Sequence, residues 1–249
     1  MPSYLITGAS RGIGLGLVQQ LLKNPENQVI ATARNPSSSK GLQELREQYP
    51  DSKRLIILTL DVSKPEDIKK AAEDAEKLLP GGLDVLINNA AILSNVLATV
   101  DEIDATEFME ELRINIVAVL EILRVFKPLV SKSTHKKIIA ISSVAGSLEL
   151  APQYPAVGLT YAVTKAGVNM LARRWGKVYQ NEGITTILIH PGWVATDMGL
   201  DGYEVLKKSM PKPPISVEES AIGIVKVIEE TKFSDTVLFL SNEGTPIPW

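Results

Sequence analysis

Short runs of apolar residues recur along the chain, and longer stretches with a helical pattern separate them. The runs are rich in Ile, Val and Leu and do not alternate with polar residues, which is typical of strands in a sheet covered on both faces. We expect strands at residues 3–7, 28–33, 54–60, 83–88, 137–142, 185–190 and 236–240. We expect helices at residues 14–23, 38–48, 65–79, 105–129, 161–181 and 217–230.

This alternation predicts an α/β fold of the Rossmann type, with a doubly wound parallel sheet flanked by helices. No repeat or low-complexity tract divides the chain, so we expect residues 1–249 to form a single domain. The least regular segment, residues 195–215, is a candidate substrate lid. A simple surface connection is an equally good interpretation of that segment.

Composition and charge narrow the functional classes. The net charge of −3 argues against a nucleic-acid partner. The chain has no cysteine and two histidines, which excludes thiolate chemistry and argues against a metal site. No apolar run is long enough to span a membrane, and the N-terminus lacks the features of a signal peptide. We therefore expect a cytoplasmic protein that has no membrane partner.

The first expected strand leads into a glycine-rich turn, and a helix follows. Glycines allow the backbone to approach a pyrophosphate closely, and the free N–H groups of a helix N-terminus attract it. The spacing differs from Gly-x-Gly-x-x-Gly, and such a turn alone is weak evidence. Its place after the first strand favours a dinucleotide site formed by Gly8, Ser10, Arg11, Gly12, Ile13 and Gly14.

The charges near this turn favour NADP(H) over NAD(H). The second strand ends near Arg34, where the carboxylate that would bind the ribose of NAD(H) is missing. Arg34 and Arg11 offer guanidinium groups suited to a 2′-phosphate, although either alone would be an ordinary surface residue. Asp61 and Val62, after the third strand, are placed to contact the adenine. Asp61 is also a candidate cap for the helix that begins near Pro65, and it could serve both roles.

Candidate reactive groups lie near the ends of later strands. Asn88 and Ala90, at the end of the fourth strand, are expected to bind the cofactor, and Ser143 follows the fifth strand. Tyr161 and Lys165 open a helix, where their i, i+4 spacing places them on one face. A neighbouring ammonium stabilises a phenolate and lowers the tyrosine pKa from about 10 toward neutrality. A serine hydroxyl could bind the developing alkoxide, and a helical asparagine, Asn115, could hold a water that links the lysine to solvent.

The Tyr-x-x-x-Lys spacing carries little information by itself. It occurs again at Tyr49 and Tyr203. Neither of these follows a strand that ends in two serines, so we attribute both to chance.

Taken together and in order, these motifs resemble the short-chain dehydrogenase/reductase family along essentially the whole chain. The resemblance implies a seven-stranded parallel sheet and reversible hydride transfer with a nicotinamide cofactor. The matching motifs are Thr7-Gly8…Gly12-Ile13-Gly14, Asn88-Asn89-Ala90, Asn115, Ser143, Tyr161…Lys165 and Pro191-Gly192…Thr196.

The resemblance also implies a role for each residue. Tyr161 would be the general acid/base, and Lys165 would bind the nicotinamide ribose and tune Tyr161. Ser143 would orient the substrate carbonyl, and Asn115 would complete a proton relay. The nicotinamide carboxamide would be held by Pro191, Gly192, Val194 and Thr196.

Residues 11–18 and 244–249 are similar to the sniffer-type, or C-factor-like, carbonyl reductases, which are NADPH-dependent. We therefore expect an enzyme that reduces an aldehyde, ketone or quinone with NADP(H) as cofactor. Ketoreduction of an aromatic polyketide, as in the norsolorinic acid ketoreductase type, is a second possibility. The motifs are also compatible with an alcohol dehydrogenase working in the oxidative direction and with a catalytically silent NADP(H)-sensing regulator.

One departure from the family pattern is the separation of Ser143 and Tyr161, which are 18 residues apart in the sequence, more than is usual. We expect the added stretch, 148–158, to form a loop near the catalytic mouth. It could disturb the helix pairing by which many family members dimerise, so monomer, homodimer and tetramer stay open. Trp249 would either cover the substrate pocket or pin the C-terminus. The expected pocket residues are Ile92, Leu93, Leu148, Tyr154, Trp193 and Met198, and several of them could instead be ordinary core.

Overall fold

The computed structural model describes residues 1–153, 158–201, 203, 207 and 214–249. Within these residues seven parallel strands form one sheet in the order β3-β2-β1-β4-β5-β6-β7, as expected. The strands are β1 (Ser3–Ile6), β2 (Gln28–Ala33), β3 (Leu55–Thr59), β4 (Val85–Asn88), β5 (Lys137–Ile141), β6 (Thr185–His190) and β7 (Leu238–Ser241).

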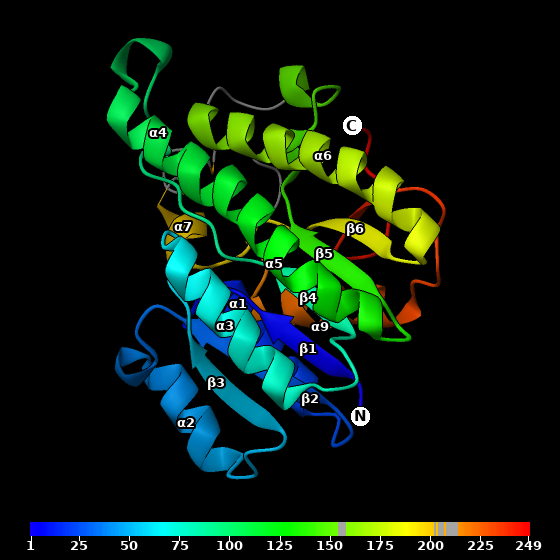
Figure 1. The fold of residues 1–249 in the computed structure, drawn as a ribbon. Helices are drawn as coiled ribbons and strands as arrows, with labels where there is room; N and C mark the ends of the chain where they lie inside the picture. Colours follow the sequence, from blue (N-terminus) through cyan, green and yellow to red (C-terminus); the bar gives the residue numbers. More distant parts are fainter. Residues whose placement is uncertain (154–157, 202, 204–206, 208–213) are drawn as a thin grey trace.

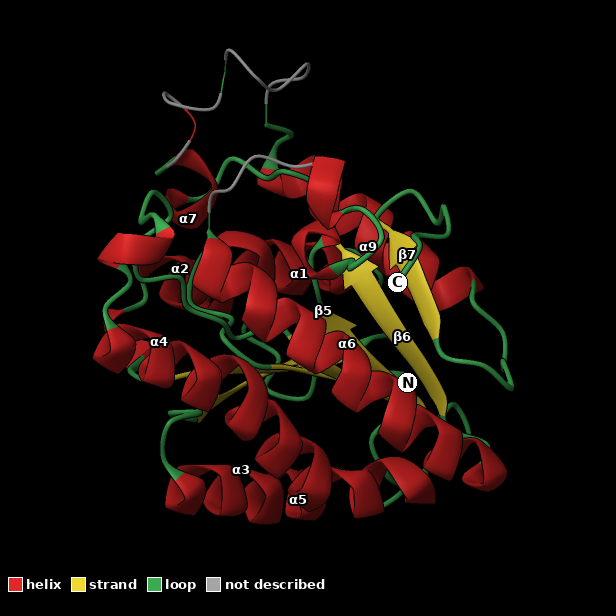
Figure 2. Ribbon diagram, turned by 90° about the horizontal axis from the view of Figure 1, so that it is seen from above, coloured by secondary structure: helices red, strands yellow, loops and turns green. Residues whose placement is uncertain are grey.

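Helices cover both faces of the sheet, which confirms the doubly wound arrangement (Figures 1 and 2). One face carries α1 (Gly12–Leu22), α2 (Lys40–Gln48) and α9 (Val217–Glu230). The other face carries α3 (Pro65–Leu78), α5 (Ala118–Lys132) and α6 (Leu159–Tyr179). Two further helices are α4 (Ala105–Leu112) and α7 (Asp197–Leu200). Short 3₁₀ turns lie at Pro36–Ser38, Val100–Glu102, Val144–Gly146, Ala151–Gln153 and Gln180–Glu182.

The strands have continuous apolar sequences because each supplies side chains to two cores. Successive side chains of a strand point to opposite faces. In β1, Tyr4 and Ile6 therefore pack with α1 and α9, whereas Leu5 packs with α3 and α5. All three side chains are buried.

The order of the strands reverses beside β1, which pairs with both β2 and β4. The chain moves from β1 through β2 to β3 on one side, and from β4 to β7 on the other. Loops leaving the carboxyl ends of β1 and β4 diverge at this point and leave a crevice in which such sheets bind ligands. The glycine-rich turn follows β1, and Asn89 follows β4.

The helix expected at 105–129 is divided in the structure. A π-helical turn, Arg113–Val117, separates α4 from α5. Such turns insert an extra residue into a helix and frequently occur at functional sites. Here the turn carries Asn115, whose side chain is buried.

The expected lid at 195–215 lies partly outside the described residues. In its described part, α7 follows the loop after β6. Ala195 N–H donates to the carbonyl oxygen of Ile215 at 2.9 Å, so the two ends of the segment are joined. No helix in the described part of the chain is both long and apolar enough to cross a membrane.

Candidate active site

A cavity of ≈ 560 Å³ lies along the carboxyl edge of the sheet. Loops after β1 to β4 form one part of its wall, and α6 and the loop after β6 form another. This wall brings together fourteen of the residues that the sequence predicts to bind a cofactor. They are Gly8, Ser10, Arg11, Gly12, Ile13, Gly14, Arg34, Asp61, Val62, Ala90, Tyr161, Lys165, Pro191 and Thr196.

The remaining expected cofactor residues, Asn88, Gly192 and Val194, do not belong to the described lining. Asn88 is the last residue of β4 and is only 4% exposed. The neighbouring Asn89 lines the cavity instead. Its Nδ2 donates to the carbonyl oxygens of Thr7 at 2.9 Å and Gly8 at 3.2 Å, which fixes the glycine-rich turn.

Two glycines let the backbone segments of this turn approach one another. Gly8 has a φ of +68°, and a Cβ there would lie 2.9 Å from the Cα of Ala90. A Cβ at Gly14 would collide with the carbonyl oxygen of Gly8. Any side chain at either position would therefore push α1 away from the sheet and disturb the cavity floor.

Charged groups gather where the loops after β1, β2 and β3 meet. Arg34 is exposed and lines the cavity. Arg11 Nη1 lies 2.8 Å from a carboxylate oxygen of Asp197 in α7, and both side chains are about three-quarters exposed. This ion pair joins the glycine-rich turn to the described start of the expected lid segment.

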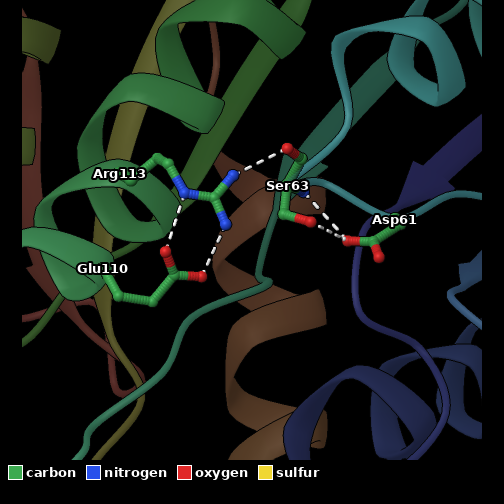
Figure 3. A network of polar contacts seen from close by, with 4 residues as sticks. All are labelled: Asp61, Ser63, Glu110 and Arg113. Atoms are coloured by element: carbon green, nitrogen blue, oxygen red, sulfur yellow. Dashed lines mark hydrogen bonds and ion pairs between the residues drawn. The ribbon is translucent and has the colours of Figure 1, made fainter. Parts of the chain in front are cut away.

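Asp61 does not cap α3, because that helix begins after Lys64 and has no side-chain cap. Its carboxylate instead accepts hydrogen bonds from the Ser63 N–H at 3.0 Å and the Ser63 hydroxyl at 2.7 Å (Figure 3). Burial by itself raises the pKa of Asp61, but these bonds and the nearby Arg34 cation outweigh it and lower that pKa. The carboxylate is therefore charged at neutral pH.

Tyr161 and Lys165 lie together in α6, as expected. Lys165 Nζ is 5.3 Å from the centre of the Tyr161 ring and donates to the carbonyl oxygen of Ile141 at 2.7 Å. Burial lowers the pKa of Lys165 to about 8. Burial, together with the negative charge of Glu111, raises the pKa of Tyr161. That direction is opposite to the expected one, because desolvation of the phenolate dominates in this arrangement.

Asn115 lies beside this pair but not in the described lining. Its Oδ1 accepts from the N–H of Ile92 at 2.9 Å, and its Nδ2 donates to the Ile92 carbonyl oxygen at 2.8 Å. Nδ2 also donates to the hydroxyl of Thr164 at 3.0 Å. Asn115 thus ties the loop after β4 to α6.

Ser143 also lies outside the described lining, at the start of the Val144–Gly146 turn. Its Oγ accepts from Ala145 N–H at 3.1 Å. The adjacent Ser142 is buried and donates to Asn169 of α6 at 2.5 Å, so Ser143 is the more accessible of the two serines. Asn169 also donates to the carbonyl oxygen of Gly146 at 3.0 Å, which holds this turn against α6.

The family model described as short chain dehydrogenase matches residues 3–203. The chain belongs to this family. The NADPH-bound carbonyl reductase from chicken fatty liver is 36% identical, with a TM-score of 0.86 and coverage of 100% of this chain and 99% of that one. The carbonyl reductase Sniffer of Drosophila melanogaster is 28% identical, with a TM-score of 0.88 and full coverage of both chains. A norsolorinic acid ketoreductase of Dothistroma septosporum is 31% identical over 99% of this chain and 92% of its own length.

Two of the six residues expected to form the substrate pocket of this short-chain dehydrogenase, Ile92 and Met198, line the cavity. Tyr154 lies outside the described residues. Leu93, Leu148 and Trp193 are not part of the described lining. The Trp193 indole N–H donates to the carbonyl oxygen of Gly199 at 2.7 Å, so this side chain supports α7.

Trp249 packs within the fold and is absent from the described lining. Its ring lies 5.4 Å from that of Phe239 and under the guanidinium of Arg173 at 4.5 Å. Its carbonyl oxygen accepts from Glu149 N–H at 2.9 Å. Of the two roles expected for Trp249, these contacts favour the one in which it pins the C-terminal segment.

Several lining residues of this short-chain dehydrogenase escaped the sequence reasoning. They come from the ends of β2 and β5, from the loops after β3, β4 and β6, and from α4, the π-helical turn, α7 and α9, and most of them belong to no motif. One weak signal was present, since Asn89 belongs to the same Asn-Asn-Ala motif as Asn88. The missed residues are Ala33, Leu60, Ser63, Asn89, Ala91, Glu110, Ile114, Ile141, Ala195, Asp197, Leu200 and Val217.

Proposed function

We propose that this short-chain dehydrogenase is an NADPH-dependent carbonyl reductase that converts an aldehyde, ketone or quinone to an alcohol. The observation that carries the proposal is one cavity lined by Tyr161 and Lys165 as well as by Arg34 and Arg11. A proton donor and a phosphate-binding group thus belong to one site. The carbonyl reductase structures from chicken and Drosophila, which the fold matches over its whole length, support the same activity.

The residues present fit a phosphorylated dinucleotide. Gly8 and Gly14 let the turn after β1 pack closely against Ala90 and against its own backbone, which keeps the start of α1 beside the cavity. No side chain caps α1 and its first turn holds no acidic residue, so its N-terminal N–H groups and positive dipole end suit a pyrophosphate. Arg34 would bind the 2′-phosphate, and Asp61 would accept a hydrogen bond from the adenine amino group.

Bound NADPH would supply the hydride for the reduction. Tyr161 would donate its hydroxyl proton to the substrate carbonyl oxygen, and Ser143 would hold that oxygen through a second hydrogen bond. Lys165 would stabilise the phenolate left on Tyr161 and bind the nicotinamide ribose. Asn115 would keep Ile92 and Thr164 in place around the reacting groups.

A polycyclic aromatic ketone is a second candidate substrate. The similarity to the Dothistroma norsolorinic acid ketoreductase favours it. Ile92, Ile114, Met198 and Leu200 give part of the cavity wall an apolar character that suits fused aromatic rings.

The test is NADPH oxidation by the purified chain with aldehydes, simple ketones, quinones and anthraquinone-type ketones. Wild type is compared with Tyr161→Phe, which keeps the ring but removes the proton donor. Tyr179→Phe is the matched control, because Tyr179 lies at the end of the same helix and contacts Lys127. The proposal predicts turnover by wild type and Tyr179→Phe, and its loss in Tyr161→Phe with NADPH still bound.

Two results would favour a different function. If all three proteins bind NADPH but none of them reduces any of the carbonyls, an NADP(H)-sensing regulator becomes the better interpretation. If wild type oxidises alcohols with NADP⁺ but reduces none of the carbonyls, the reaction runs in the oxidative direction.

A further inference from the structure

An ion pair between α4 and the π-helical turn reaches the loop at the end of β3. The guanidinium of Arg113 forms two parallel hydrogen bonds to Glu110, from Nε at 2.7 Å and from Nη2 at 2.6 Å (Figure 3). Its remaining nitrogen, Nη1, donates to the carbonyl oxygen of Ser63 at 2.7 Å. The planar guanidinium is thus held on one edge by a carboxylate and directed at a backbone atom of another segment.

The network continues from Ser63 to Asp61. The N–H and hydroxyl of Ser63 both donate to one carboxylate oxygen of Asp61. The second oxygen accepts no hydrogen bond among the described residues. Glu110, Ser63 and Asp61 all line the cavity, together with Val62. Arg113 therefore stands directly behind the wall that would meet the adenine.

The exposure of this pair limits what it contributes to stability. The side chains of Arg113 and Glu110 are 45% and 47% exposed, and ion pairs in such positions contribute little to the free energy of unfolding. Along the same helical run, Arg124 and Glu121 form a similar i, i+3 pair at 2.5 Å. No hydrogen bond from Arg124 to a loop of the cavity exists among the described residues. The third bond of Arg113 is what distinguishes the two pairs.

We infer that Arg113, oriented by Glu110, is a positioning residue that fixes the 61–63 loop for the adenine of the cofactor. This inference rests on the proposed NADPH site. Arg113 also opens the π-helical turn that carries Asn115. One turn thus holds the adenine end of the cavity through Arg113 and the reactive end through Asn115.

The experiment measures binding of three probes to the full chain by calorimetric titration. NADPH spans the whole cavity, 2′,5′-ADP carries only the adenine half, and reduced nicotinamide mononucleotide carries only the nicotinamide half. The variant is Arg113→Gln, and the matched control is Arg124→Gln. A second variant, Glu110→Gln, removes the carboxylate that orients the guanidinium of Arg113 but keeps the guanidinium itself. Thermal melting without ligand checks that each protein is folded.

Arg113→Gln is expected to weaken NADPH and 2′,5′-ADP about tenfold and to leave the mononucleotide unchanged. Glu110→Gln is expected to weaken the same two probes by a smaller factor, and this variant decides the question if Arg113→Gln does not fold. Arg124→Gln should bind all three like wild type. Equal affinities of Arg113→Gln and Arg124→Gln for 2′,5′-ADP would overturn the inference, as would an equal loss for the mononucleotide. If wild type binds none of the probes, the proposed cofactor falls as well.

Discussion

The ammonium of Lys165 lies 5.3 Å from the ring centre of Tyr161, on the face of the helix that borders the cavity. Its hydrogen bond to the carbonyl oxygen of Ile141 holds it there. A cation over an aromatic face is attracted by the ring and also stabilises a phenolate. The structure therefore places the charge that the proposed reaction needs, even though burial raises the pKa of Tyr161.

Removal of this ammonium is predicted to stop turnover. Lys165→Ala loses the group that stabilises the phenolate and the proposed contact to the ribose, so kcat/KM should fall by a factor of about 100 or more. Lys177→Ala, an exposed lysine of the same helix, serves as the control. Steady-state reduction of the best carbonyl substrate measures both. Near-normal activity of Lys165→Ala would show that the acid/base assignment is wrong.

Glu111 is predicted to set the pKa of Tyr161 from α4. It is 1% exposed, and its Oε1 accepts from Ser94 N–H at 2.7 Å. Its charge raises the pKa of Tyr161, second to burial. Glu111→Gln keeps an oxygen for Ser94 but removes the charge, so the pKa of Tyr161 should fall.

Ultraviolet absorbance of the phenolate against pH measures this pKa, as the difference between each protein and the same protein carrying Tyr161→Phe. The exposed Glu107→Gln on the same helix is the control. If the pKa of Tyr161 is the same in Glu111→Gln and Glu107→Gln, the charge of Glu111 does not influence the ionisation of Tyr161.

Arg34 is predicted to determine cofactor preference. Arg34→Asp replaces a cation that would pair with the 2′-phosphate by a charge that repels it, while NADH lacks that phosphate. The dissociation constant of NADPH should rise by about 100-fold, and that of NADH should change by less than about threefold. Fluorescence titration with both cofactors measures the two constants. Arg46→Asp, at an exposed position of α2, controls for the change in net charge. If Arg34→Asp weakens the binding of NADPH and NADH by the same factor, Arg34 does not bind the 2′-phosphate.

The fold could be predicted from the sequence because contacts between elements distant in the chain restrict which residue types each element can carry. A strand buried on both faces must be apolar throughout, and β1 shows this directly in Tyr4, Leu5 and Ile6. The glycine-rich turn was equally predictable, since the close approach of Gly8 to Ala90 tolerates no side chain. These constraints act on residue type and leave a pattern in the sequence.

The parts that could not be predicted depend on orientation rather than on residue type. Asn88 and Asn89 are chemically identical, and only the end of β4 decides that the first is buried and the second reaches the cavity. Glu110 and Glu111 differ in the same way, one lining the cavity and the other buried. The π-helical turn lies inside the helix expected at 105–129 and contains neither glycine nor proline, so nothing in the sequence marked it.

His190 is predicted to weaken the fold in acid. Its Nδ1 accepts from Val144 N–H at 3.2 Å, and burial lowers its pKa from 6.5 to about 4. Between pH 6.5 and pH 4 this histidine is protonated in the unfolded chain but neutral in the folded chain. The free energy of unfolding therefore keeps its full value above pH 6.5 and decreases as the pH falls toward 4. At pH 5 the loss should be about 2 kcal/mol.

His190→Asn keeps an acceptor for Val144 but cannot be protonated, so its free energy of unfolding should fall less between pH 7 and pH 5. Urea denaturation at both pH values measures this, with the exposed His135→Asn as the control. Equal pH dependence in the two variants would show that His190 is not the responsible group.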